Sequence, residues 1–134
     1  MTQEEKQLLL KDLCSRLPYG VIVYNPNPAG GEWDELISID IPTGTVTLLY
    51  DGCTYKVEKI KPYLRPLSSM TKEERNEYLD FRNQELQRVA FAEIGRESAI
   101  AEISDWLNAH QFDYRDLIPM GLALEATKDM YKTE

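Results

Sequence analysis

The side chains best suited to chemistry lie in one short basic segment. Residues 56–65 contain four bases and one acid, and the bases are Lys56, Lys59, Lys61 and Arg65, with Tyr63 among them. Lysine and arginine bind phosphate and carboxylate groups through charge-assisted hydrogen bonds, and a tyrosine ring can stack on a base. The segment is therefore a candidate site for a small, nucleotide-like anion.

A second group with the same chemistry lies near the C-terminus, where Tyr114 and Arg115 are neighbours. If the fold brings this pair beside the basic segment, the two groups line one groove and hold a single anion. The alternative is that the lysines have a structural role, because lysine on an edge strand discourages pairing with another sheet and also attracts acidic helices. The sequence leaves both interpretations open.

The patterns typical of enzymes and metal centres are missing from the sequence. His110 is the only histidine, which excludes zinc sites built on two histidines; its place near an expected helix end favours a structural role. A catalytic triad assembled in space stays open, but no Gly-x-Ser-x-Gly elbow occurs. Residues 29–31 lack the spacing of a phosphate loop and are interpreted as a loop tip. We expect a non-enzymatic protein without cofactor or metal.

Charge and hydropathy narrow the range of partners. The 134 residues carry a net charge of −8, which repels phosphate backbones, so duplex nucleic acid is not an expected partner. No apolar run approaches the roughly 20 residues that cross a bilayer, and the acidic N-terminus is unlike a secretory signal. We expect a cytoplasmic protein with no membrane partner, in which Cys14 and Cys53 are small buried hydrophobic residues.

The first element is a helix over about residues 3–17. Thr2 and Glu5 have the spacing of a capping box, which marks the start of the helix. Pro18 and Gly20 mark its end. Apolar residues recur at steps of three and four and predict one buried face, made of Leu9, Leu10, Leu13, Cys14 and Leu17.

Four short β segments follow, at residues 21–24, 33–41, 45–50 and 53–60. In the second, Ile37, Ile39 and Ile41 alternate with polar residues, which predicts a half-buried strand with the isoleucines inward. Residues 61–67 contain two prolines and are expected to form an extended connector.

The third and fourth segments flank Asp51-Gly52, the sequence of a two-residue hairpin turn. Such a turn predicts a buried face on which Tyr50 pairs with Cys53, Leu48 with Tyr55 and Val46 with Val57. The expected product is a small curled antiparallel sheet of about four strands, for which an SH3-like partial barrel is one form.

The second half of the chain is expected to be helical. Thr71 and Glu74 form a second capping box, and the helix that follows is expected to extend to residue 94. A third helix is expected over residues 98–110, and a short one over 114–120 with Asp113 as its N-cap. The inward residues predicted for the two longer helices are Tyr78, Leu79, Leu86, Val89, Ala90, Ile100, Ile103, Trp106 and Leu107.

These elements predict a single α+β domain over residues 1–134. Its β-rich part covers about residues 18–66 and its helical part about residues 71–134. The N-terminal helix and the C-terminal helices are expected to pack on the sheet.

Several stretches of the chain resemble small proteins encoded by phages and prophages of gut Bacteroidetes. The matching segments are residues 10–20, 60–71, 106–110, 112–115, 117–126 and 130–131, about a third to a half of the chain. That family is functionally uncharacterised, so the resemblance implies a genomic setting and a bacterial host cytoplasm, and it carries over no site residues.

Taken together, these patterns predict a non-enzymatic accessory protein that binds a host or phage protein. One alternative is a protein that sequesters an anionic, nucleotide-like signal and so counters host defence. A minor virion component and a small enzyme also stay open. A homodimer is compatible with an exposed strand edge or a long helix.

Overall fold

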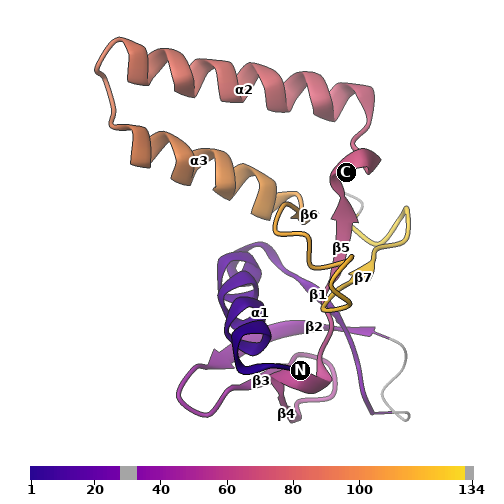
Figure 1. Ribbon diagram of the computed structural model, residues 1–134. Coiled ribbons are helices and arrows are strands. Elements are labelled where there is room, and N and C mark those ends of the chain that lie inside the picture. The colour runs from indigo at the N-terminus through magenta and orange to yellow at the C-terminus, as the bar shows by residue number, and fades with distance from the viewer. Residues whose placement is uncertain (28–32, 132–134) are drawn as a thin grey trace.

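Three α-helices and two small sheets make up the part of the chain that a computed structural model describes, residues 1–27 and 33–131 (Figure 1). The predicted loop tip at residues 29–31 lies outside the described residues. The structure confirms the predicted α+β class, with an N-terminal helix, a four-stranded antiparallel sheet and C-terminal helices. The SH3-like form and the single domain stay predictions.

The first helix, α1 (Gln3–Arg16), begins where the sequence predicts. Thr2 Oγ1 accepts a hydrogen bond from the Glu5 N–H at 3.0 Å, and Glu5 Oε1 accepts one from the Thr2 N–H at 2.8 Å. Leu9 and Leu13 are fully buried, as the apolar spacing predicts. The capping box therefore sets the start of the helix, and its apolar face packs into the core.

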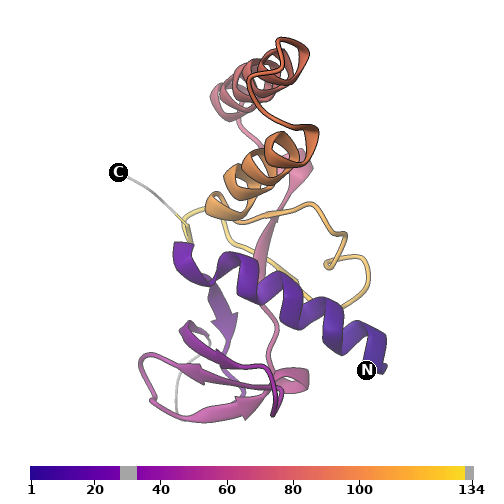
Figure 2. The same ribbon diagram turned by 90° about the vertical axis from the view of Figure 1, so that its left-hand side faces the viewer.

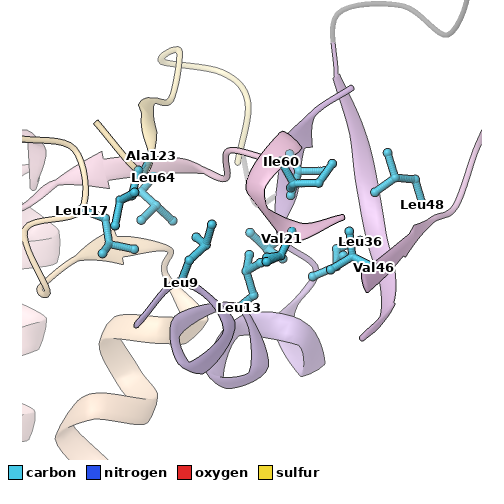
Figure 3. Packing of buried hydrophobic residues seen from close by; sticks show 13 residues of the cluster. Leu9, Leu13, Val21, Leu36, Val46, Leu48, Ile60, Leu64, Leu117 and Ala123 are labelled. Atoms are coloured by element: carbon cyan, nitrogen blue, oxygen red, sulfur yellow. The ribbon is translucent and has the colours of Figure 1, made fainter. Parts of the chain in front are cut away.

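The core lies between α1 and the antiparallel sheet, with a continuation toward the C-terminal segments (Figure 3). The sheet contains β1 (Ile22–Tyr24), β2 (Trp33–Asp40), β3 (Thr45–Leu48) and β4 (Thr54–Lys56), paired in chain order. Besides Leu9 and Leu13 of α1, the buried residues of this core are Val21, Val23, Leu36, Val46, Leu48, Val57, Ile60, Leu64, Leu117, Leu122 and Ala123.

The predicted inward face of β2 is wrong at two of its three isoleucines. Ile37 is 45% exposed and Ile41 is 62% exposed, while Leu36 is buried. The pairing of β2 with β3 shifts register between Leu36 and Ser38. Such an irregularity changes which side chains face the core, and strict alternation in the sequence does not reveal it.

The hairpin between β3 and β4 has a different register from the predicted one, because Val46 pairs with Tyr55 instead of Val57. Residues 49–53 form the connection, in which the Asp51 carboxylate accepts hydrogen bonds from the Cys53 N–H at 2.8 Å and the Tyr55 hydroxyl at 2.6 Å. A shift of two residues preserves the faces of the strands, so Val46 stays inside. Cys53 is exposed, contrary to the prediction.

The predicted fourth strand is also shorter than expected. The chain leaves β4 after Lys56 and forms the 3₁₀ turn η3 (Val57–Lys59). The predicted connector at 61–67 instead contains β5 (Tyr63–Pro66), the central strand of a parallel sheet with β6 (Phe112–Asp113) and β7 (Leu124–Glu125).

The predicted short helix at 114–120 is absent among the described residues, which form turns there. The Asp113 carboxylate accepts hydrogen bonds from the Leu117 and Ile118 N–H groups, both at 2.9 Å. Asp113 therefore organises the turn between β6 and β7 instead of capping a helix.

The helices α2 (Lys72–Ala90) and α3 (Arg96–Ala109) form a hairpin that projects away from the four-stranded sheet, as both views show (Figures 1 and 2). The Thr71 capping box is present as predicted. The helix α2 ends four residues earlier than expected, and Ala92 after it has a φ of 58°.

The inner face of this hairpin differs from the predicted one. Tyr78 contacts Trp106 with their ring centroids 5.2 Å apart, and Glu85 is only 6% exposed. Leu79 and Leu86 are 41% and 46% exposed, and Ile100 is exposed as well. Acidic residues thus occupy part of the inner face of α2, while two leucines face the solvent.

Candidate binding surfaces

Arg65, the arginine of the predicted anion site, is held in an ion pair. Its guanidinium donates to both Glu74 carboxylate oxygens, at 2.8 and 2.5 Å, and lies 4.2 Å from the centre of the Phe112 ring. The hydrogen bonds from Arg65 lower the pKa of Glu74 to about 2. The pair links β5 to the first turn of α2, and the charge of Arg65 is already compensated.

The other predicted arginine, Arg115, also has a carboxylate partner. Its Nε lies 3.3 Å from Asp12 Oδ1, and its Nη2 donates to the Tyr114 hydroxyl at 3.2 Å. The Tyr114 hydroxyl in turn donates to Asn108 Oδ1 at 3.0 Å. Arg65 and Arg115 are therefore held by different carboxylates.

The three predicted lysines lie at or after the edge strand β4. Lys56 ends this strand, Lys59 ends the 3₁₀ turn, and both are exposed, whereas Lys61 is half-buried. Tyr63 lies in β5. An exposed lysine at the sheet edge matches the structural interpretation, in which lysine discourages pairing with another sheet.

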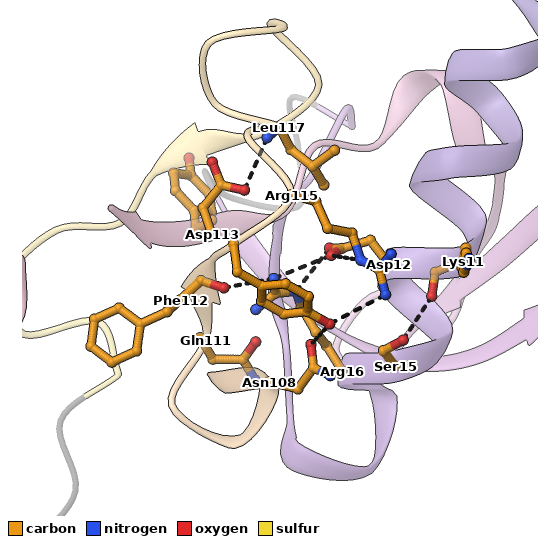
Figure 4. Close-up of polar contacts among 12 residues, drawn as sticks. Lys11, Asp12, Ser15, Arg16, Asn108, Gln111, Phe112, Asp113, Arg115 and Leu117 are labelled. Atoms are coloured by element: carbon orange, nitrogen blue, oxygen red, sulfur yellow. Dashed lines mark hydrogen bonds and ion pairs between the residues drawn. The ribbon is translucent and has the colours of Figure 1, made fainter. Parts of the chain in front are cut away.

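A buried polar cluster, missed in the sequence analysis, connects α1 to the C-terminal half (Figure 4). Arg16 Nε donates to Asp12 Oδ2 at 2.8 Å, and Arg16 Nη2 donates to the Phe112 carbonyl at 2.7 Å. The side chains of Asp12 and Arg16 are both fully buried. The spacing of four residues beside Leu9 and Leu13 was the only sequence signal for this pair.

A cleft of about 550 Å³ lies between the sheet and the base of the helical hairpin. Tyr19, Glu35, Arg65, His110 and Gln111 are among the residues that line it. His110 caps the C-terminus of α3, as expected; its ring is stacked 3.9 Å from Trp106, and Nδ1 lies 2.8 Å from the Trp106 carbonyl oxygen.

A second hollow, about 540 Å³, is apolar and lies beside α1, where Leu10, Cys14 and Ile41 line it. Burial raises the pKa of the Cys14 thiol, so this thiol stays protonated at neutral pH. Cys14 therefore contributes an apolar contact and not a reactive thiolate.

The solvent side of α2 is the third candidate surface. We call it the outer face, and it contains Lys72, Arg75, Asn76, Leu79, Arg82, Asn83, Leu86, Gln87 and Ala90, all exposed. At 3.6 residues per turn these positions form one continuous stripe. The stripe itself contains three bases, two leucines and no acid, and the exposed acids Glu73, Glu77 and Asp80 lie along one edge of it.

Within residues 1–27 and 33–131, no group of three histidine, cysteine, aspartate or glutamate side chains could hold a metal ion. Nor does any helix in these ranges have the length and apolarity needed to cross a membrane.

Comparisons with known proteins identify no relative. A scan against protein-family models finds no match, and searches of curated proteins and of solved structures find none either. The resemblance to phage and prophage proteins of gut Bacteroidetes stays a prediction.

The Arg65–Glu74 pair predicts a pH-dependent contribution to stability. The pKa of Glu74 is lowered from 4.5 to about 2 in the folded protein, so the contribution is present above about pH 4.5 and lost as the pH falls toward 2. Solvent still reaches the pair, so we expect about 1 kcal/mol. Urea unfolding of wild type and Glu74→Gln should show this difference near pH 7 and not near pH 2.

The exposed neighbour variant, Glu73→Gln, is the matched control and should change stability little. A difference between Glu74→Gln and wild type that stays constant from about pH 7 to about pH 2.5 would contradict the ion pair.

Proposed function

We propose that this protein is a non-enzymatic binding module that docks a protein partner through the outer face of α2. One observation carries the proposal. A helix on a projecting hairpin presents Leu79 and Leu86 to solvent, one above the other, with Arg75 and Arg82 beside them.

The chemistry of this face is that of recognition helices. Leucines spaced seven residues apart form an apolar ridge that fits a groove on a partner, and burial of each leucine favours association. Arginine is enriched at binding hot spots because its guanidinium combines charge, hydrogen bonds and stacking. An apolar ridge with arginines along one side therefore suits a groove with an acidic rim.

Charge selects the class of partner. The chain has a net charge of −8, yet the outer face of α2 contains bases and no acid. Complementary charge speeds the encounter with an acidic surface and suppresses other partners. Two copies that met through this face would bring arginines of like charge together, which disfavours the homodimer.

The setting of the proposed binding is the cytoplasm of a bacterial host, where the partner is a host or phage protein. The resemblance to phage and prophage proteins supports this setting. Anti-defence activity is one form that such binding takes.

The alternative function, sequestration of an anionic nucleotide-like signal, has weaker support. Its two arginines, Arg65 and Arg115, already have carboxylate partners, Glu74 and Asp12. The alternatives of a virion component or a small enzyme have no specific geometric support among the residues described.

The experiment that tests the proposal captures partners from host lysate on the tagged full-length chain. We expect an acidic protein that is retained at low salt, released at higher salt, and absent when the leucines of the outer face are replaced by aspartate. Equal capture by the wild type and this variant would refute the proposal.

A further inference from the structure

The cleft between the sheet and the helical hairpin has a chemistry of its own. Its wall on one side comes from the 3₁₀ turn η1 (Leu17–Tyr19), Gly20 and β2, and on the other from β5 and the C-terminus of α3. The outer face of α2 contributes no residue to it. An inference about the cleft is therefore independent of the proposed protein docking.

One carboxylate in the cleft has no donor among the described residues. The half-buried Glu35 carboxylate has no hydrogen-bond or ion-pair partner among the described residues. A half-buried carboxylate without a donor or counter-charge is costly, so Glu35 favours a ligand that donates hydrogen bonds and carries positive charge.

Gly20 leaves room for the Glu35 carboxylate at the cleft wall. Its φ of 78° is a conformation that suits glycine, and Glu35 Oε1 lies only 3.6 Å from the place where a Cβ would stand. The Glu35 carboxylate therefore lies directly over the backbone of Gly20, whose carbonyl holds the Gln111 amide.

Among the described residues, no cation that lines the cleft is paired with Glu35. The Arg65 guanidinium is hydrogen-bonded to both carboxylate oxygens of Glu74. Lys128 also lines the cleft, and its side chain is exposed. The ring of Tyr19, also on the wall, is 43% exposed. A carboxylate with no partner among the described residues and an accessible aromatic ring are groups that bind an ammonium ion.

We propose that this cleft binds a primary alkylammonium group. Such a group donates up to three hydrogen bonds and supplies the positive counter-charge that Glu35 lacks among the described residues, while its alkyl chain and charge suit the face of Tyr19. A small free diamine and a lysine side chain both carry this group. The charge preference is opposite to that of the nucleotide-sequestering alternative.

Isothermal titration of the full-length protein tests this proposal. The probes are putrescine, Nα-acetyl-lysine methylamide, whose side-chain ammonium is free, and inorganic phosphate. The titrations use about 150 mM salt so that the net charge of −8 is screened. We expect saturable binding of an amine at one site. Binding by putrescine alone identifies a free amine as the ligand, and binding by the lysine derivative alone identifies a side chain.

The variant Glu35→Gln keeps the shape of the side chain and removes its charge. We expect it to weaken amine binding at least tenfold, since a hydrogen bond to a charged group is lost. The control is Asp105→Asn, which removes an exposed acid on α3 and should leave the affinity unchanged.

Three results would overturn the proposal: no saturable binding of either amine, equal weakening in both variants, or tighter binding of phosphate. Equal weakening would mean that the amines bind only through the net charge. The melting temperature of each unliganded variant shows whether the fold is intact.

Discussion

Asp12→Ala is expected to destabilise the fold by about 3–5 kcal/mol, because it removes one member of a buried ion pair. Arg16 is fully buried, and Asp12 is the carboxylate that compensates it. The same carboxylate lies 3.3 Å from Arg115 Nε. Without Asp12, two guanidinium groups lose their counter-charge in surroundings that water reaches poorly. Their uncompensated desolvation lowers the free energy of unfolding.

Urea unfolding at neutral pH measures this effect. Lys11→Ala, at an exposed position of the same helix, is the control and should stay within about 0.5 kcal/mol of wild type. Asp12→Asn, which keeps the shape of the side chain, should also destabilise more than the control. If Asp12→Ala cost no more than Lys11→Ala, the buried cluster would not hold α1 to the C-terminal half.

The size of this effect does not mean that the ion pair is more stabilising than an apolar pair would be. Replacing both partners by apolar residues is often neutral, whereas removing one leaves an isolated charge. The Asp12–Arg16 pair also fixes position, since Arg16 Nη2 donates to the carbonyl of Phe112, 96 residues later in the chain. We infer that the pair sets the orientation of α1 against the β5–β6 region.

The second expected result concerns partner binding: Leu79→Asp together with Leu86→Asp should weaken it by at least about 100-fold. Burial of each leucine in the partner's groove contributes about 2 kcal/mol, and each new carboxylate would also meet an acidic partner. Both leucines are already more than 40% exposed, so the variant should remain folded. Affinity for the purified partner is the measurement.

The chain offers a closely matched control for this variant. Leu49 and Leu67 are each 44% exposed and lie outside α2. Leu49→Asp together with Leu67→Asp makes the same change in charge and apolarity elsewhere on the surface, and it should leave the affinity within about threefold of wild type. Equal losses in both double variants would mean that general charge, and not the outer face, governs binding.

Elements whose signals are local could be predicted from the sequence. The capping boxes at Thr2 and Thr71 mark two helix starts correctly, because their hydrogen bonds join residues three positions apart. The apolar spacing of Leu9 and Leu13 likewise predicts their burial. Composition and element order were enough for the α+β class.

Features that depend on distant partners could not be predicted. Residues 63–66 form a strand because β6 and β7, some fifty to sixty residues later, supply its neighbours. The hairpin connection is held by the buried Asp34 carboxylate of β2, which accepts hydrogen bonds from the Tyr50 and Asp51 N–H groups at 2.9 and 3.2 Å. The burial of Asp12 and Arg16 depends on groups near Phe112 and Arg115.

The error on α2 has a different cause. Hydrophobic periodicity places Leu79 and Leu86 inside, but the structure places Glu74 and Glu85 on the inner side, where Arg65 and Arg88 compensate them. Natural proteins depart from the binary pattern mainly at functional sites. The reversed pattern of this helix is therefore the same observation that supports its role as a docking surface.

Site-specific photo-cross-linking tests the docking surface most directly. A benzoylphenylalanine in place of Asn83 lies between the two exposed leucines on the outer face, whereas the same residue in place of Gln84 lies on the acidic side of α2. In cells of the proposed bacterial host we predict a cross-linked acidic protein from position 83 and little or none from position 84. Three results would contradict the account: equal products from both positions, a product made only of two copies of this chain, or no product from position 83.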